Sequence, residues 1–234
     1  NDEAAAVATD ASGNLYAAGF FSGAADFSGT PLVSRGGEDI FVAKYNPAGA
    51  LQWVAQAGGA GDDRATGLAL DSTGTRVLVT GFFSGGADFT VTNFTSAGHT
   101  DIVLAQLDRF GNWLWASQAG GSSRDAALGV AVDESGNAYI TGYCQGSARF
   151  DGFTLSGGAT NEVFVARYNS SGRVTWARSA GGPSSDTGRA VACDRKGRVY
   201  VAGSFRGSAT FGTFGLTSPG GLGIFLAQYN AVNG

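Results

Sequence analysis

The 234-residue chain repeats one sequence unit four times, and this repetition limits its possible folds more than any other feature. The marker Asp-x-x-Gly recurs at spacings of 61, 62 and 61 residues, at Asp10, Asp71, Asp133 and Asp194. In the first three copies the unit closes on Trp and then Gly-Gly, as in "ALQWVAQAGG". A period of this kind predicts stacked structural repeats, here at about 1–62, 63–124, 125–185 and 186–234, within a single domain spanning 1–234.

Each copy predicts four short β-strands. Val, Ile, Phe, Tyr and Thr are concentrated in short runs bounded by Gly, Asn, Asp and Ser, and no stretch keeps helical periodicity over three turns. Asp-x-x-Gly suits a tight turn between the first two strands, because Asp can bond the backbone ahead and Gly accepts positive φ. Four-stranded antiparallel sheets repeated about an axis form a propeller, so we expect an all-β, four-bladed β-propeller.

The chain ends at "LAQYNAVNG", before any fourth strand of the last copy. We therefore expect fifteen strands, with the last blade lacking its outer strand. Three arrangements agree with this count: a four-bladed monomeric ring with one short blade, part of a longer array, or two chains that combine into a larger dimeric ring. We expect the monomeric ring.

Aromatic residues recur at fixed positions of the unit. A blade cannot bury either face alone, so each must present an apolar surface to its neighbour. Aromatic residues at constant spacing belong to a hydrophobic core more often than to a ligand-binding surface. The Gly-Gly that follows each Trp lets the chain turn inward. The sequence predicts interblade packing for seven of them: Trp53, Trp115, Trp176, Phe27, Phe89, Phe150 and Phe211.

The segments "GNLYAAGFFSGAADF", "DIFVAKYN" and "WVAQAGG" together resemble the bacterial SBBP β-propeller repeat. This resemblance implies an exported or cell-surface bacterial protein with no common enzymatic activity. The family's name implies seven blades, from which four copies depart. The pattern of Ala43, Asn46, Gly49 and Trp53 is also similar to the tryptophan-docking motif of quinoprotein propellers. That likeness implies interblade packing only, because none of the cofactor-site residues of those enzymes has a counterpart here.

A second aspartate precedes each marker by eight residues, giving the series Asp2, Asp63, Asp125 and Asp186. In a closed ring these side chains would gather at one mouth of the central channel. Carboxylate oxygens there could bind Ca²⁺ or another hard cation. Alternatively, each Asp bonds backbone N–H groups of its own loop or of the next blade. No other cofactor is expected.

The Gly-rich links between the second and third strands are about 15 residues long and differ among the copies. Long loops on a rigid scaffold often carry binding sites, and His99, Arg149 and Asn161 lie in these links. We expect a non-enzymatic scaffold that contacts proteins or matrix through its loop face. The alternative is a carbohydrate-binding propeller with a glycan partner. A hydrolase or lyase at the channel mouth is the least favoured reading.

Composition excludes several classes. The net charge of −4, with scattered basic residues, disfavours nucleic acid as a partner, and no apolar run is long enough for membrane insertion. The single His forms no histidine metal cluster, and Asp62 beside Asp63 is an ordinary loop pair, so no catalytic residue is predicted. Cys144 and Cys193 replace apolar residues of the repeat, which favours two buried thiols over a disulfide.

Overall fold

The computed structural model describes residues 1–234 and contains nineteen β-strands and no helix. Because there is no helix, none is available to cross a membrane. The expected all-β class is therefore confirmed, with antiparallel sheets of the kind that build propellers.

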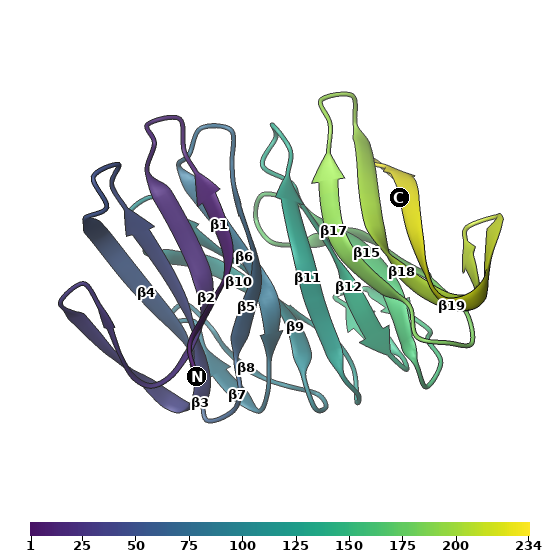
Figure 1. The fold of residues 1–234 in the computed structure, drawn as a ribbon, viewed down its shortest axis with the longest axis horizontal. Coiled ribbons are helices and arrows are strands. Elements are labelled where there is room, and N and C mark those ends of the chain that lie inside the picture. The colour runs from purple at the N-terminus through teal and green to yellow at the C-terminus, as the bar shows by residue number, and fades with distance from the viewer.

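The main strands form four antiparallel units, which we call blades 1 to 4 and which stand side by side in the order of the chain (Figure 1). Blade 1 comprises β1 (Glu3–Thr9), β2 (Leu15–Phe27), β3 (Thr30–Tyr45) and β4 (Leu51–Gly59). Blade 2 comprises β5 (Arg64–Leu70), β6 (Arg76–Phe83), β9 (Asp101–Asp108) and β10 (Trp113–Ala119). Blade 3 comprises β11 (Asp125–Val132), β12 (Ala138–Gln145), β15 (Asn161–Tyr168) and β16 (Val174–Ala180). Blade 4 has three strands, β17 (Thr187–Cys193), β18 (Arg198–Phe211) and β19 (Phe214–Asn230).

The turn between the first two strands follows the chemistry of Asp-x-x-Gly. In blade 1 the Asp10 carboxylate accepts hydrogen bonds from the backbone N–H groups of Ser12 and Asn14, and Gly13 adopts φ +78°. The amide of Gly13 donates to the Asp10 carbonyl at 3.0 Å, which closes the turn. The side-chain hydrogen bond from Asn14 is the main cause that holds the pKa of Asp10 below its usual value.

The Gly-rich links are β-hairpins and not loops, which corrects the interpretation from the sequence. In blade 2 the hairpin is β7 (Gly86–Asp88) with β8 (Asn93–Thr95), and in blade 3 it is β13 (Ala148–Phe150) with β14 (Phe153–Leu155). In blades 1 and 4 the second and third strands simply continue into the hairpin. Pairing between the small strands satisfies backbone groups that an open loop would leave to water.

The hairpins of blades 2, 3 and 4 each reach back to the blade before them. Gly58 and Gly59 at the end of β4 pair with Asp88 and Ala87 of β7. The same contact recurs as an isolated bridge between Gly120 and Arg149, and again between Gly181 and Thr210. The Gly-Gly doublet is therefore a junction between blades, where a side chain would collide with the incoming strand: a Cβ on Gly59 would lie 1.9 Å from the carbonyl oxygen of Gly86.

The four blades form an open arc, so the expected closed ring is wrong. The first strands β1, β5, β11 and β17 pack in sequence, each against the next. Blades 1 and 4 lie at opposite ends of the row (Figure 1). Closure would require β17 to pack against β1, and the angle between successive blades keeps these strands apart. The outward side chains of blade 4 therefore have no neighbour, as the 88% exposure of Ile224 shows.

Candidate functional site

The predicted interblade tryptophans each lie against a turn of the following blade. The Trp53 indole donates its Nε1–H to the Arg109 carbonyl at 2.9 Å, and that of Trp176 donates to the Ala231 carbonyl at 3.1 Å. The ring of each Trp faces a glycine of that turn, and the pairs are Trp53 with Gly111, Trp115 with Gly172, and Trp176 with Gly234. Trp176 is buried, whereas Trp53 and Trp115 are half-buried. A glycine lets the flat indole approach the turn directly.

The predicted phenylalanines lie on the hairpins. Phe89, Phe150 and Phe211 are buried in three clusters that join blades 1 and 2, blades 2 and 3, and blades 3 and 4. Phe27 of blade 1 is half-buried and belongs to a smaller cluster within its own blade.

Three of the predicted aspartates link neighbouring blades through backbone hydrogen bonds. Asp63 accepts from the amide of Gly59 at 2.7 Å and from that of Ser84 at 3.2 Å. Gly59 ends β4 of blade 1 and Ser84 follows β6 of blade 2, so one carboxylate joins both blades. Asp125 and Asp186 repeat these two bonds with Gly121 and Gln145, and with Gly182 and Arg206.

Asp2 differs from the other three aspartates because it accepts a backbone hydrogen bond only within its own blade. Its side chain is exposed and accepts from the Ser22 amide at 3.1 Å. No group of three or more His, Cys, Asp and Glu residues is arranged to hold a metal ion. The series of four aspartates is therefore distributed along the arc, one at each blade, and a Ca²⁺ site there stays a prediction.

Sequence reasoning missed a second carboxylate beside each linking aspartate. A Cβ on Gly58 would lie 2.7 Å from Asp39 Cγ and 2.8 Å from Asp63 Oδ2, so both carboxylates face this glycine. Asp101 and Asp125 surround Gly120 in the same way. One oxygen of Asp39 accepts from Gln56 Nε2 at 2.7 Å, while Oδ1 is buried without a hydrogen-bond partner. The Asp-Ile pair that recurs in the third strands of blades 1 and 2, at Asp39 and Asp101, was the available signal.

Burial controls the electrostatics of these pairs. Burial raises the pKa of Asp63 to about 7, and repulsion from Asp39 and Asp62 adds to this effect. Burial likewise raises the pKa of Asp125 to about 6. The hydrogen bonds from backbone amides oppose the shift but do not cancel it. The charged form of each pair is therefore costly inside the arc.

A cleft of about 380 Å³ opens between blades 2 and 3, at the ends where β5 and β11 begin. It contains the single histidine and two arginines, and its lining consists of Asp62, Arg64, Phe82, Ser84, His99, Thr100, Arg124 and Tyr143. Of the link residues singled out in the sequence, only His99 lies here. Arg149 instead donates to the Asp151 carbonyl, and Asn161 accepts from Gln145.

Three side chains of this cleft that can donate hydrogen bonds have no partner within the protein, whereas Arg64 has one. Arg64 forms an ion pair with Glu38 of blade 1, and its guanidinium lies 4.4 Å from the centre of the Phe20 ring. The side chains of Arg124, His99 and Tyr143, in contrast, make no hydrogen bond or ion pair within the chain. Burial raises the pKa of the Tyr143 hydroxyl, which therefore stays protonated and can donate. Tyr143 occupies the repeat position of Phe20 and Phe82, so blade 3 adds a phenolic hydroxyl where blades 1 and 2 have phenylalanine.

Both cysteines are free thiols. Cys144 is buried in the cluster between blades 2 and 3, and Cys193 is half-buried beside the cluster between blades 3 and 4. Burial raises the pKa of the Cys193 thiol to about 11, and that of Cys144 well above its usual value. Neither thiol is therefore activated for nucleophilic chemistry.

Residues 114–147 match the protein family described as Beta-propeller repeat, which confirms the resemblance seen in the sequence. The chain is also 27% identical over 216 residues to the uncharacterized WD repeat-containing protein L264 of Acanthamoeba polyphaga mimivirus. That alignment covers 75% of this chain and 15% of the viral protein, so the chain spans a small part of that relative. Both similarities are to repeat-containing proteins, and the family match is to a propeller repeat.

Proposed function

We propose that this chain is a β-propeller module that binds a segment of a partner protein in the cleft between blades 2 and 3. The similarities to propeller and WD repeats support protein interaction in general. The cleft is the proposed binding site, because it is concave and the side chains of His99, Arg124 and Tyr143 in its lining have no partner within the fold.

The observation that carries this proposal is the set of unpartnered donors. Arg124, His99 and Tyr143 converge on one hollow from three different segments. Arg189 on β17 also acts electrostatically on Tyr143 and forms no ion pair. The Asp62 carboxylate is already engaged by the backbone amide of Glu38 at 3.3 Å. The free groups therefore favour an acidic side chain or a terminal carboxylate of the partner.

The proposal is tested by selecting peptides from a phage-displayed library on the immobilised full chain. Selected peptides are then synthesised, and their dissociation constants are measured by fluorescence anisotropy. We expect them to be rich in Asp and Glu. Arg124→Glu should weaken binding about tenfold or more, since it replaces an attraction by a repulsion.

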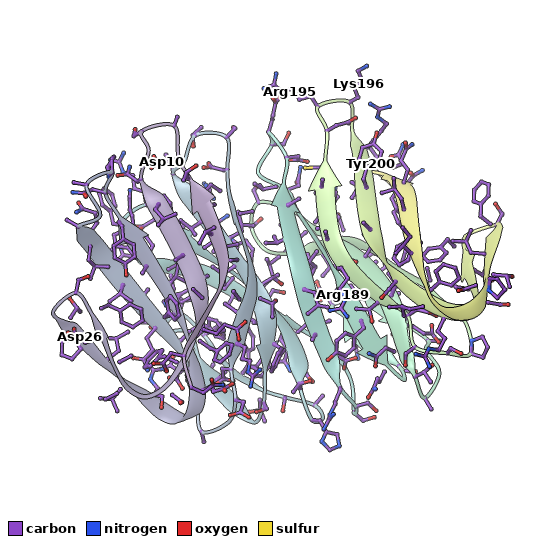
Figure 2. All side chains as sticks on the ribbon, viewed as in Figure 1. Asp10, Asp26, Arg189, Arg195, Lys196 and Tyr200 are labelled. Atoms are coloured by element: carbon purple, nitrogen blue, oxygen red, sulfur yellow. The ribbon has the colours of Figure 1, made fainter.

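Lys196→Glu is the matched control. It makes the same change of charge in the turn between β17 and β18, at the far end of blade 4 from the region around Arg189 (Figure 2). This control should leave affinity unchanged. Peptides whose affinity ignores Arg124→Glu would contradict the proposal. Saturable binding on a glycan array with no peptide enrichment would favour a carbohydrate ligand instead.

A further inference from the structure

Backbone hydrogen bonds hold the cleft between blades 2 and 3 in shape. The carbonyl of Arg124 accepts from the Gln145 amide at 3.2 Å, and the carbonyl of Ser123 accepts from the His99 amide at 3.1 Å. Tyr143 lies two residues before Gln145 on β12. The fold therefore places His99, Arg124 and Tyr143 around one hollow without using their side chains.

The junction between blades 1 and 2 shows how the chain itself neutralises a guanidinium at this end of the blades. There Arg64 forms an ion pair with Glu38 of the preceding blade. At the repeat position of Glu38, the junction between blades 2 and 3 has the uncharged Thr100. It also has Arg124 at the position of Asp62. Because no ion pair of the chain includes Arg124, its counter-charge is left to a ligand.

A second unpaired guanidinium is near Tyr143. Arg189 lies on β17, which packs against β11 and β12, in the part of the strand farther from the turn at Arg195 (Figure 2). Both Arg124 and Arg189 act electrostatically on the Tyr143 hydroxyl. The other three copies of the repeat have an uncharged residue at the position of Arg189. Departures from the repeat thus gather two cations and one phenolic hydroxyl in the same region.

These donors exceed what one carboxylate can accept. A carboxylate has two oxygens and a single negative charge. A phosphorylated side chain has three strong acceptor oxygens and a charge of about −1.5 to −2 at pH 7, and guanidinium groups bind it through paired hydrogen bonds. Burial raises the pKa of Tyr143, so its hydroxyl stays protonated and adds a further donor. Two guanidinium groups and a hydroxyl match the charge and the oxygens of a phosphoryl group better than those of a carboxylate.

We propose that the cleft recognises a phosphorylated side chain of the partner, with the phosphoryl oxygens bound by Arg124, Arg189 and Tyr143. This inference rests on the proposed function, because it names the acidic group that the cleft binds in the partner segment. The ring of His99 supplies another donor in the same lining. Asp62 is the one carboxylate of the lining, and it repels the ligand although it accepts from the Glu38 amide.

The test uses the full chain and an array of synthetic peptides with varied residues around one fixed central position. The central residue is phosphoserine, phosphotyrosine, glutamate or serine. Each peptide that the chain retains is resynthesised with all four central residues, and dissociation constants are measured by fluorescence anisotropy. We expect a phosphorylated form to bind about tenfold or more tightly than its glutamate form. Inorganic phosphate should compete only at much higher concentration, because it lacks the peptide contacts.

Variants of the cleft locate the phosphoryl group. Arg189→Gln and Tyr143→Phe should each weaken the phosphorylated peptide about fivefold or more and the glutamate peptide less, since each removes a donor that a carboxylate does not need. Asp62→Asn should tighten the phosphorylated peptide roughly threefold by removing a repulsion. Arg195→Gln makes a matched change in the turn between β17 and β18, and this control should leave both affinities unchanged.

The outcomes distinguish this inference from the proposed function. Equal affinities for phosphorylated and glutamate peptides, both lost in Arg124→Glu, would overturn the phosphoryl assignment and leave the binding cleft in place. An array from which the chain retains no peptide would overturn both. A preference for phosphate that survives Arg189→Gln and Tyr143→Phe, or displacement by inorganic phosphate as effective as that by the unlabelled peptide, would also overturn the assignment to a phosphorylated side chain in this cleft.

Discussion

At the scale of single residues, the junctions depend on glycines beside carboxylates. Gly58, Gly120 and Gly181 adopt φ of +145°, +148° and +153°, and acidic side chains occupy the space that a Cβ would need. This arrangement buries acidic groups and satisfies most of their oxygens with backbone amides. Buried carboxylates that are held this way make the stability of the chain depend on pH.

We expect the free energy of unfolding to rise when the pH falls from about 8 to about 5, by a few kcal/mol. The raised pKa values of Asp63, about 7, and Asp125, about 6, mean that the folded state binds more protons than the unfolded state in this window. Their stabilising contribution is complete below the unfolded pKa and is lost as the pH rises through the folded pKa. Urea unfolding at a series of pH values measures this, and a stability that increases towards pH 8 would contradict it.

Asp39→Asn should stabilise the chain at about pH 8 by roughly 1 kcal/mol and flatten the pH dependence. The substitution removes one of the two charges at Gly58, and the new amide can keep the hydrogen bond with Gln56 while offering a donor where Oδ1 has no partner. Asp26→Asn, on the exposed hairpin of blade 1 (Figure 2), is the control and should change stability by less than about 0.5 kcal/mol. The prediction is wrong if both variants behave alike in urea unfolding.

Alanine substitutions at two equivalent glycines distinguish the cost of backbone strain from the cost of crowding the tryptophan ring. Gly49 and Gly111 occupy the same turn position, with φ of +78° and +87°. A Cβ on Gly49 would meet nothing, but on Gly111 it would lie 2.8 Å from the Trp53 ring. Both Ala variants lose roughly 1 kcal/mol from strain. We expect Gly111→Ala to cost about 1–3 kcal/mol more through overpacking, and equal losses in thermal unfolding would refute a role for this contact.

The recurring residues were predictable from the sequence because repetition makes them visible. Trp53, Phe89 and Asp63 stand at constant spacing, and the structure places each at a junction between blades. The cleft was not predictable in the same way. Arg124 and Tyr143 are departures from the repeat, and their convergence with His99 depends on how blades 2 and 3 are angled.

At the scale of elements, the strands of the hairpins are the feature that the pattern of the sequence did not predict. Their small strands have three residues each in blades 2 and 3, too short to show alternation, and their Gly and Ser content is typical of loops. The continuous strands β2 and β19 contain the same Gly-rich segments, because pairing and not propensity extends them.

The third strands of the blades should differ in hydrogen exchange. The strands β9 and β15 are paired on both sides, whereas β19 pairs only with β18 and leaves one edge open. We expect strong protection throughout β9 and β15, and fast exchange at alternate amides of β19, because only those facing β18 have partners. Amide exchange read by NMR measures this, and uniform protection along β19 would indicate that another strand pairs with its edge.

At the scale of the whole molecule, the arc is a row of blades in which apolar clusters form between neighbours. Three clusters of 15, 15 and 11 buried residues join the four blades, so most of the core lies between sheets and little within any one of them. Stability in such an array is nearly a sum of blade terms and nearest-neighbour terms. Repetition in the sequence predicts one sheet for each copy, but ring closure depends on the angle between blades, which repetition alone does not specify.

This additivity predicts that shortened arrays fold. Residues 1–185 keep the first two junctions and should unfold cooperatively in urea, with an m-value about three quarters of that of the full chain. Residues 63–234 keep the last two junctions, and we expect this fragment to be the less stable one, because it loses a cluster of 15 buried residues whereas the other loses one of 11. Urea unfolding of both fragments at one low protein concentration gives the comparison. If neither fragment folds, the four blades form one indivisible cooperative unit, and nearest-neighbour packing is insufficient to account for the stability of the arc.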